Sequence, residues 1–87
     1  MKLNVSLYIP IYNGESTIES VLKAALKLDP APDEIIVVND GSTDKTAKIL
    51  EKFGDQIKII NNESNKGLAY SRNIGVLNSK NENVASI

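Results

Sequence analysis

Short apolar runs alternate along this chain with segments whose apolar residues recur at helical spacing. Residues 35–38 are all apolar and mostly β-branched, without the alternation of a half-exposed strand. That pattern predicts a strand covered on both faces of a parallel sheet. Residues 5–9 and 57–60 predict two further strands, and residues 84–87 begin a fourth.

The segments between these strands predict three helices. Apolar residues follow Ile18 at i+3, i+4, i+7 and i+8, which is one full helix face. Ser16 and Glu19 have the spacing of a capping box at the start of this helix. We expect a second helix over residues 44–53 and a third over residues 68–77.

Turn residues separate these elements. Pro10 cannot donate to a central ladder, so we expect it to end the first strand. Residues 29–33, Asp-Pro-Ala-Pro-Asp, break the first helix, and Gly54 ends the second. The resulting order, βαβαβαβ, predicts an α/β fold with a doubly wound, mostly parallel sheet of right-handed βαβ units.

Composition and length narrow the class of protein. The net charge of −1 argues against a nucleic-acid-binding surface, and no apolar run has the length of a membrane span. Without cysteine or histidine, acid–base chemistry must come from carboxylates. Residues 1–87 suffice for one small domain, and because the sequence stops inside a predicted strand we expect the front piece of a longer domain.

The candidate chemistry lies where the 35–38 strand ends. Asp40 follows this strand, and open α/β sheets bind ligands at the carboxyl ends of their strands. Gly41 permits a tight turn, and Ser42, Thr43 and Asp44 are all suitable caps for the next helix. The glycine-rich fingerprints of dinucleotide and phosphate binders are absent, and Pro10 stands where a receiver domain needs acidic residues.

Three segments make the chain similar to a known family. Residues 9–13 read Ile-Pro-Ile-Tyr-Asn, residues 37–44 read Val-Val-Asn-Asp-Gly-Ser-Thr-Asp, and residues 65–75 read Asn-Lys-Gly-Leu-Ala-Tyr-Ser-Arg-Asn-Ile-Gly. They resemble family-2 glycosyltransferases, which are inverting enzymes of the GT-A nucleotide-diphosphosugar-transferase fold. The resemblance extends from Val5 to Ile87, and each motif follows a predicted strand.

The resemblance implies a nucleotide site at this edge of the sheet. Pro10 and Tyr12 would line the base and ribose pocket, and Asp40 would accept a hydrogen bond from N3–H of uracil. Asn39 stands where the family often has a second aspartate, which bears on the preference for uracil. The implied nucleotide-binding residues are Pro10, Tyr12, Asn13, Glu15, Asp40, Gly41, Ser42 and Arg72.

Plainer interpretations stay open for three of these residues. Asp40 could be an ordinary turn or cap aspartate, and Glu15 an exposed acid in the first helical turn. Arg72 could pair with the base or with Asp40, or it could be a solvated helix arginine.

The resemblance also implies groups beyond this sequence. The family's Asp-x-Asp, which binds the divalent cation and the diphosphate, is expected after Ile87, as are the catalytic base and the acceptor-binding half. We therefore expect no catalytic and no metal-binding residue within 1–87. The full-length enzyme would use Mg²⁺ or Mn²⁺, whereas this fragment alone would bind no cation and be inactive.

The sequence therefore predicts the nucleotide-binding part of a glycosyltransferase. It would transfer a sugar, with inversion, from a nucleotide-diphosphate sugar, most simply UDP-linked, to an acceptor hydroxyl on a sugar or a lipid-linked glycan. The alternatives are a sugar nucleotidyltransferase of the same fold and a non-catalytic nucleotide-binding or interaction module. We expect a cytoplasmic protein, with or without attachment to the cytoplasmic face of the membrane. The free edge of strand 84–87 predicts self-association.

Overall fold

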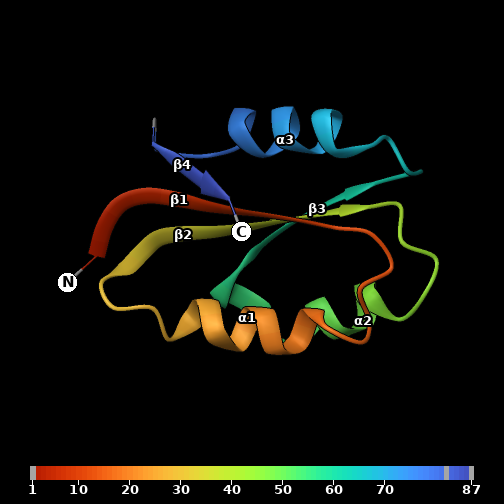
Figure 1. Cartoon of the computed structure of the whole chain (residues 1–87), viewed down its shortest axis with the longest axis horizontal. Coiled ribbons are helices and arrows are strands. Elements are labelled where there is room, and N and C mark those ends of the chain that lie inside the picture. Colours follow the sequence, from red (N-terminus) through yellow and green to blue (C-terminus); the bar gives the residue numbers. More distant parts are fainter. Residues whose placement is uncertain (1, 82, 87) are drawn as a thin grey trace.

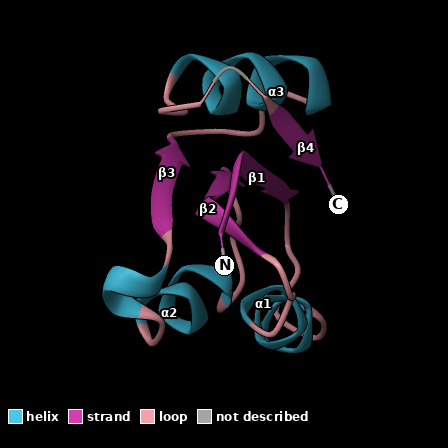
Figure 2. Cartoon of the chain, turned by 90° about the vertical axis from the view of Figure 1, so that its left-hand side faces the viewer, coloured by secondary structure: helices cyan, strands magenta, loops and turns pink. Residues whose placement is uncertain are grey.

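The strands of this chain form one parallel sheet with helices on both faces (Figures 1 and 2). The structure is a computed structural model and describes residues 2–81 and 83–86. Its elements are, in chain order, β1 (Lys2–Ile11), α1 (Ile18–Leu26), β2 (Ala31–Asp40), α2 (Thr46–Glu51), the 3₁₀ turn η1 (Gly54–Gln56), β3 (Lys58–Asn62), α3 (Leu68–Leu77) and β4 (Val84–Ser86).

The sheet has the strand order β3-β2-β1-β4, and every pairing in it is parallel. α1 and α2 lie along one face, while α3 lies along the other (Figure 1). The predicted α/β fold with a doubly wound parallel sheet is confirmed, and the fourth strand lies beside the first. Ile87, which was predicted to continue that strand, lies outside the described residues.

The apolar run of β2 forms the centre of the core. Ile35, Ile36, Val37 and Val38 are all buried, as their unbroken hydrophobicity predicts. Because successive side chains point to opposite faces, Ile35 and Val37 join the cluster under α1 and α2, whereas Ile36 and Val38 join Tyr8 under α3. One strand thus supplies both layers of the core.

The first two strands are longer than predicted, and both contain proline. Pro10 does not end β1; it pairs in register with Val38, and the strand continues to Ile11. β4 pairs only with Ser6 to Tyr8, so Pro10 lies beyond the end of the neighbouring strand on that side. A proline is tolerated in a strand where one side has no ladder to complete.

The helices follow the prediction unevenly. α3 has the predicted limits, but α2 is shorter than residues 44–53, and Gly54 opens η1. The expected capping box at α1 is wrong. The Gly14 carbonyl accepts the N–H groups of Thr17 and Ile18, and the Glu19 carboxylate instead pairs with Lys23 at 3.0 Å. A backbone carbonyl in the preceding turn replaces the predicted side-chain cap.

Within the described ranges, no helix is both long enough and apolar enough to cross a membrane.

α3 lies close to the sheet because small residues face inward. Ser71 and Gly75 are its buried residues, and a Cβ added at Gly75 would lie 2.7 Å from Cδ1 of Tyr8. The larger apolar side chains therefore face outward: Leu68 is 75% exposed and Leu77 is 79% exposed.

The Tyr8 hydroxyl is buried beneath α3 without a hydrogen-bond partner among the described residues. Burial raises the pKa of Tyr8, and the nearby Arg72 guanidinium acts in the opposite direction. A buried hydroxyl without a partner costs the free energy of its lost hydration.

Replacing this hydroxyl tests its environment. We expect Tyr8→Phe to leave the free energy of unfolding unchanged or to raise it by up to about 1 kcal/mol, because no protein hydrogen bond is lost. Urea unfolding measures the change, with Tyr70→Phe as the matched control because Tyr70 is 44% exposed. A loss of more than about 1 kcal/mol for Tyr8→Phe alone would show that the hydroxyl has a partner.

Candidate functional site

The polar motifs of this chain meet at the carboxyl edge of the sheet. The register of β1 and β2 places Ile11 beside Asn39, and that of β2 and β3 places Asp40 beside Asn62. The loops that follow these three strands, at residues 12–17, 41–45 and 63–67, therefore begin next to one another. This is the edge at which open α/β sheets bind ligands.

Asn13 joins the first two of these loops. Its backbone N–H donates to Oγ of Ser42 at 2.9 Å, and its Oδ1 accepts the backbone N–H of Thr43 at 2.8 Å. Asn13 has a φ of 50°, in the left-handed region that asparagine adopts more readily than most residues. Both its backbone and its side chain therefore hold one loop against the other.

Two further hydrogen bonds extend this contact. The N–H of Gly14 donates to Oγ1 of the buried Thr46 at 2.9 Å, and the N–H of Glu15 donates to Oδ2 of Asp44 at 3.2 Å. We refer to residues 13–15, together with residues 42–46 that they bind, as the loop clamp. It binds the start of one βα connection to the start of the next.

None of the three predicted caps is the N-cap residue of α2, which is Lys45, but Asp44 binds the first residue of this helix from the position before Lys45. Its Oδ1 accepts both the backbone N–H and the hydroxyl of Thr46, the first residue of α2. Burial acts to raise the pKa of Asp44, but the hydrogen bonds from Thr46 and from the N–H of Glu15 outweigh it and hold the pKa below its ordinary value. This carboxylate is thus committed to the loop clamp.

Asp40 binds the third loop and the start of α3. Its Oδ1 accepts the side-chain amide of Asn62 and the backbone N–H of Lys66, each at 2.8 Å, and its Oδ2 accepts the backbone N–H of Gly67 at 2.9 Å. Gly67 is the N-cap residue of α3. The carboxylate therefore lies at the positive end of the helix dipole, where a negative charge is most stabilised.

The environment of Asp40 favours its charged form. Only 5% of the residue is exposed, and this burial acts to raise the pKa of Asp40. The donors from Lys66, Asn62, Gly67 and Ser71 together outweigh burial and hold the pKa below its ordinary value. Asp40 is therefore an ionised carboxylate held by neutral donors.

A second pair of polar residues, Asn39 and Asn61, links the carboxyl ends of β2 and β3. Nδ2 of Asn39 donates to Oδ1 of Asn61 at 3.1 Å, and Oδ1 of Asn39 accepts the N–H of Ser42 at 3.3 Å. Asn39 and Asn61 are register partners, just as Asp40 and Asn62 are. β3 therefore extends to Asn62, beyond the predicted end at residue 60, because these polar side chains continue the pairing of the apolar strand.

Gly41 is necessary where the second loop passes the third. It has a φ of 71°, and a Cβ at this position would lie 2.5 Å from the backbone nitrogen of Asn65 and 2.7 Å from Cα of Ser64. Gly54 has a similar φ of 54° but nothing within 4 Å of its added Cβ. Gly41 thus meets both a conformational and a steric requirement, whereas Gly54 meets only the first.

The predicted site residues divide into two groups. The first group lies together at the carboxyl edge of the sheet and serves the fold: Asn13, Asp40 and Ser42 form hydrogen bonds within the protein, and Gly41 has no side chain that would clash with the third loop. Tyr12, Glu15 and Arg72 have exposed side chains, and Tyr12 is 49% exposed. Pro10 is half-buried at the end of β1.

Arg72 does not pair with Asp40 in this structure. Ion pairs among the described residues join Lys23 to Glu19 and Lys80 to Asp33, and no ion pair among those residues joins Arg72 to Asp40. Arg72 instead lines a hollow of about 400 Å³ on α3 together with Asn73, Val76 and Leu77. Of the alternatives considered for Arg72, pairing with Asp40 is therefore wrong.

Three residues that bind the site together were not predicted from the sequence: Asn61, Asn62 and Thr46. Asn61 and Asn62 follow the third apolar run directly, as Asn39 and Asp40 follow the second. That parallel was the available signal, since the carboxyl ends of adjacent parallel strands share one edge. Nothing in the local pattern indicated that Thr46 would be wholly buried beneath Gly14.

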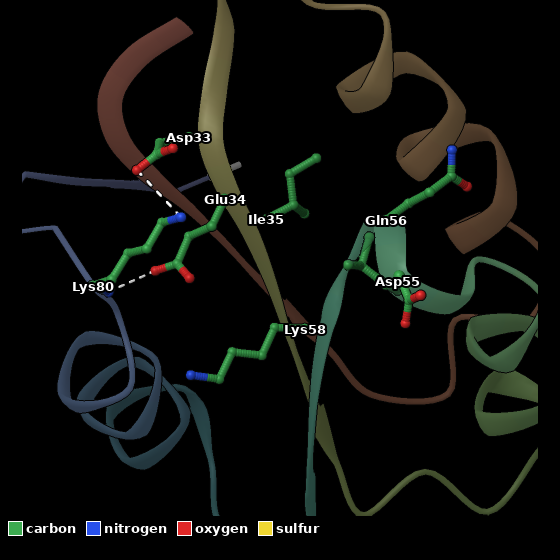
Figure 3. Close-up of a pocket in the computed structure, with 8 residues that line it drawn as sticks. Asp33, Glu34, Ile35, Asp55, Gln56, Lys58 and Lys80 are labelled. Carbon is green, nitrogen blue, oxygen red and sulfur yellow. Dashed lines mark hydrogen bonds and ion pairs between the residues drawn. The ribbon is translucent and has the colours of Figure 1, made fainter.

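A separate hollow of about 250 Å³ lies at the amino ends of β2 and β3 (Figure 3). The Nζ of Lys80 pairs with Asp33 at 3.5 Å, and the backbone N–H of Lys80 donates to Glu34 at 2.7 Å. These contacts hold the segment between α3 and β4 against the start of β2. They lie at the opposite end of the sheet from the loop clamp and stabilise the fold.

No cluster within residues 2–81 and 83–86 matches a metal centre. No group of three or more acidic residues there is placed to hold an ion. Asp40 and Asp44, the two acids at the carboxyl edge of β2, each accept several protein hydrogen bonds. Hard cations need several converging oxygen ligands, so the residues described here do not fit a divalent cation.

Comparison with known proteins defines the class. The family described as glycosyl transferase family 2 matches residues 6–87. An uncharacterized glycosyltransferase of Rickettsia typhi is 42% identical over 78 residues, which cover 90% of this chain and 24% of that protein. The chain belongs to glycosyl transferase family 2, and it spans about a quarter of the length of this relative.

Solved structures support the same class. S. aureus TarS 1–349 in complex with UDP-GlcNAc is 31% identical with a TM-score of 0.86, and the match covers 98% of this chain and 26% of the TarS 1–349 chain. Glucosyl-3-phosphoglycerate synthase from Mycobacterium tuberculosis, in complex with Mn²⁺, UDP and phosphoglyceric acid, is 26% identical with a TM-score of 0.80. That match covers 95% of this chain and 31% of the synthase. The fold is therefore that of GT-A glycosyltransferases, as the sequence predicts.

The charge of Asp40 has a measurable effect on stability. Its pKa is lowered in the folded state, so its contribution is present above the unfolded-state pKa of about 3.9 and is lost as the pH falls through the folded-state pKa. We expect Asp40→Asn to lower the free energy of unfolding by about 2 kcal/mol at pH 7, because one amide N–H₂ would face a backbone donor.

Urea unfolding of both proteins at pH 7 and pH 3 tests this. The difference between wild type and Asp40→Asn should shrink at pH 3, because that pH lies below the unfolded-state pKa of about 3.9 and the unfolded chain then binds the proton. Asp55→Asn serves as the control, since Asp55 is an exposed acid at η1. A difference that stays the same at both pH values would mean that the charge of Asp40 does not contribute.

Proposed function

We propose that residues 1–87 form the nucleotide-binding N-terminal part of a glycosyltransferase catalytic domain. The donor is a nucleotide-diphosphate sugar whose nucleotide is UDP, and the acceptor is a hydroxyl of a sugar or a lipid-linked glycan. The observation that carries this proposal is the carboxyl edge of the sheet, where three loops are joined around an ionised Asp40. The complexes of TarS with UDP-GlcNAc and of the mycobacterial synthase with UDP support the choice of uridine.

Asp40 keeps room for a ligand despite its protein contacts. The hydrogen bonds from Asn62 and Lys66 fall on Oδ1 and the one from Gly67 falls on Oδ2, and Ser71 is a further donor to this carboxylate. A carboxylate oxygen can accept more than one hydrogen bond, and we propose that Oδ2 also accepts N3–H of uracil when a nucleotide binds. The same interactions that bind α3 keep this carboxylate ionised and oriented.

The exposed residues supply the rest of the pocket. We propose that Pro10 and Tyr12 line the base and ribose, because β1 ends beside Asn39 and places Tyr12 next to the end of β2. Arg72 approaches the base from α3, and the Glu15 side chain is free to reach the ribose because only its backbone N–H is used in the loop clamp. Gly41 and Ser42 border the pocket as parts of the second loop.

Transfer itself needs groups other than those described. We propose that sugar transfer proceeds with inversion and uses a downstream Asp-x-Asp, a divalent cation and a catalytic carboxylate. The Mn²⁺ in the mycobacterial synthase supports a cation for the family. Since no group of three or more acidic residues within 2–81 and 83–86 is placed to hold a cation, we propose that this chain alone has no transferase activity. A cytoplasmic location stays a prediction.

The alternatives make different demands on the first loop. A sugar nucleotidyltransferase needs a glycine-rich basic loop after β1, whereas residues 12–17 are occupied by the loop clamp and contain no basic residue. A non-catalytic module would share the nucleotide site but not the family's transfer reaction. The transferase proposal is the one that family membership favours.

Tyr12 is the cleaner probe of the site. Asp40→Asn disturbs the start of α3 as well as any ligand contact, whereas the Tyr12 side chain is exposed. We expect Tyr12→Ala to weaken UDP binding about ten-fold, because an aromatic ring stacked on a base contributes about 1–3 kcal/mol. Backbone amide shifts during UDP titration measure the dissociation constant.

Tyr70→Ala is the control, because it removes an exposed aromatic ring from α3. Its dissociation constant for UDP should stay within about two-fold of wild type. If UDP at millimolar concentration moves no amide near the loop clamp of the wild-type chain, the proposed function is wrong.

The outer edge of β4 is a second interaction surface. Val84–Ser86 pair with β1 alone, and no charged residue or proline lies among these three residues. We propose that two copies of the chain associate along this edge, because an unpaired strand without such protection is a template for pairing. Sedimentation velocity over a wide concentration range should show a monomer–dimer equilibrium, and a monomer throughout would contradict it.

A further inference from the structure

We propose that Asn13 is a positioning residue of the nucleotide site. It holds Tyr12 in place through the loop clamp and does not contact the nucleotide itself. This inference rests on the proposed function, in which Tyr12 stacks against the base and ribose. It replaces the expectation that Asn13 is a direct ligand contact.

The hydrogen-bonding capacity of Asn13 is largely used within the protein. Its N–H donates to Ser42, and its Oδ1 accepts the backbone N–H of Thr43 at 2.8 Å and the Thr43 hydroxyl at 3.4 Å. Because a backbone N–H can only donate, the contact with Thr43 requires the oxygen of the side-chain amide on that side. What remains of the side chain for a ligand is the Nδ2 amide.

Tyr12 depends on its neighbours for its position. Ile11 on one side is the last residue of β1 and pairs with Asn39, and Asn13 on the other side is held by the second loop. The side chain of Tyr12 is 49% exposed, so packing restrains it little. The backbone direction at Tyr12 is therefore set by the strand end before it and by Asn13 after it.

The left-handed conformation makes residue 13 selective. A φ of 50° excludes most side chains by steric strain but admits glycine, asparagine and aspartate. Of these three, glycine lacks the acceptor for Thr43. Aspartate keeps an acceptor oxygen but lacks the Nδ2 donor. The variants Asn13→Gly and Asn13→Asp together therefore distinguish positioning of Tyr12 from direct contact with the nucleotide.

The two hypotheses predict opposite results for Asn13→Asp. If Asn13 positions Tyr12, aspartate preserves the hydrogen bond to Thr43 and rescues binding, whereas Asn13→Gly loses it. If Asn13 donates Nδ2 to the nucleotide, aspartate and glycine lose affinity alike. Neutral uridine is used beside UDP, so that repulsion between an added carboxylate and the diphosphate is not mistaken for lost positioning.

The experiment is a titration of wild type, Asn13→Gly, Asn13→Asp and Ser16→Ala with uridine and with UDP, followed by amide shifts. Ser16→Ala is the control because Ser16 is exposed on the same loop. The ring signals of Tyr12 are recorded for each protein without ligand. Far-UV circular dichroism confirms that each variant is folded at the temperature of the assay.

We expect Asn13→Gly to bind uridine at least five-fold more weakly, with the ring signals of Tyr12 shifted towards those of an unstructured tyrosine. Asn13→Asp should bind uridine within two-fold of wild type and leave those ring signals in place. Equal binding by Asn13→Gly and wild type would overturn the inference, as would equal losses by both Asn13 variants with Tyr12 unmoved.

Two safeguards keep the result interpretable. If the wild-type chain binds neither uridine nor UDP, the proposed function fails, while the ring signals of Tyr12 still report whether Asn13 positions that residue. If Asn13→Gly does not fold, Ser42→Ala replaces it, because this variant removes the acceptor of the Asn13 N–H. A Ser42→Ala protein with unchanged Tyr12 signals and unchanged affinity would then overturn the inference.

Discussion

The structure depends most on one interaction, the carboxylate of Asp40 at the amino end of α3. Asp40 is the last residue of β2, and it accepts hydrogen bonds from the end of β3 and from the start of α3. Because the group is charged and almost wholly buried, losing these donors would leave an uncompensated charge. The central strand, its neighbour and the helix on the far face are thereby held in one arrangement.

The loop clamp continues the same organisation towards α1 and α2. Asn13 binds the second loop from the first, while Gly41 allows the second loop to contact the third. The motifs that suggested a ligand site are thus mainly devices that hold three loops together. Polar groups that are bound within the protein hold the loops in position, and the exposed side chains of Tyr12 and Arg72 remain available to a ligand.

Sequence analysis succeeded where local pattern and tertiary packing agree. The four apolar residues 35–38 are buried on both faces, and α3 has the predicted limits. Two predictions were wrong for different reasons. Pro10 remains inside β1 because β4, more than 70 residues further along the chain, is short. At the start of α1 the carbonyl of Gly14 replaces the capping box expected of Ser16 and Glu19, because the turn conformation before the helix brings this carbonyl to the N–H groups of Thr17 and Ile18.

The sequence by itself determined the class of fold, the family and the strand end that carries Asp40, because hydrophobic period and motif order are local properties of the chain. Only the tertiary structure decided what Asp40 and Asn13 bind, since their partners lie between 22 and 30 residues away. A carboxylate or an amide can serve a ligand or the fold equally well. Which of these it serves is decided by the donors that the folded chain brings within hydrogen-bonding distance.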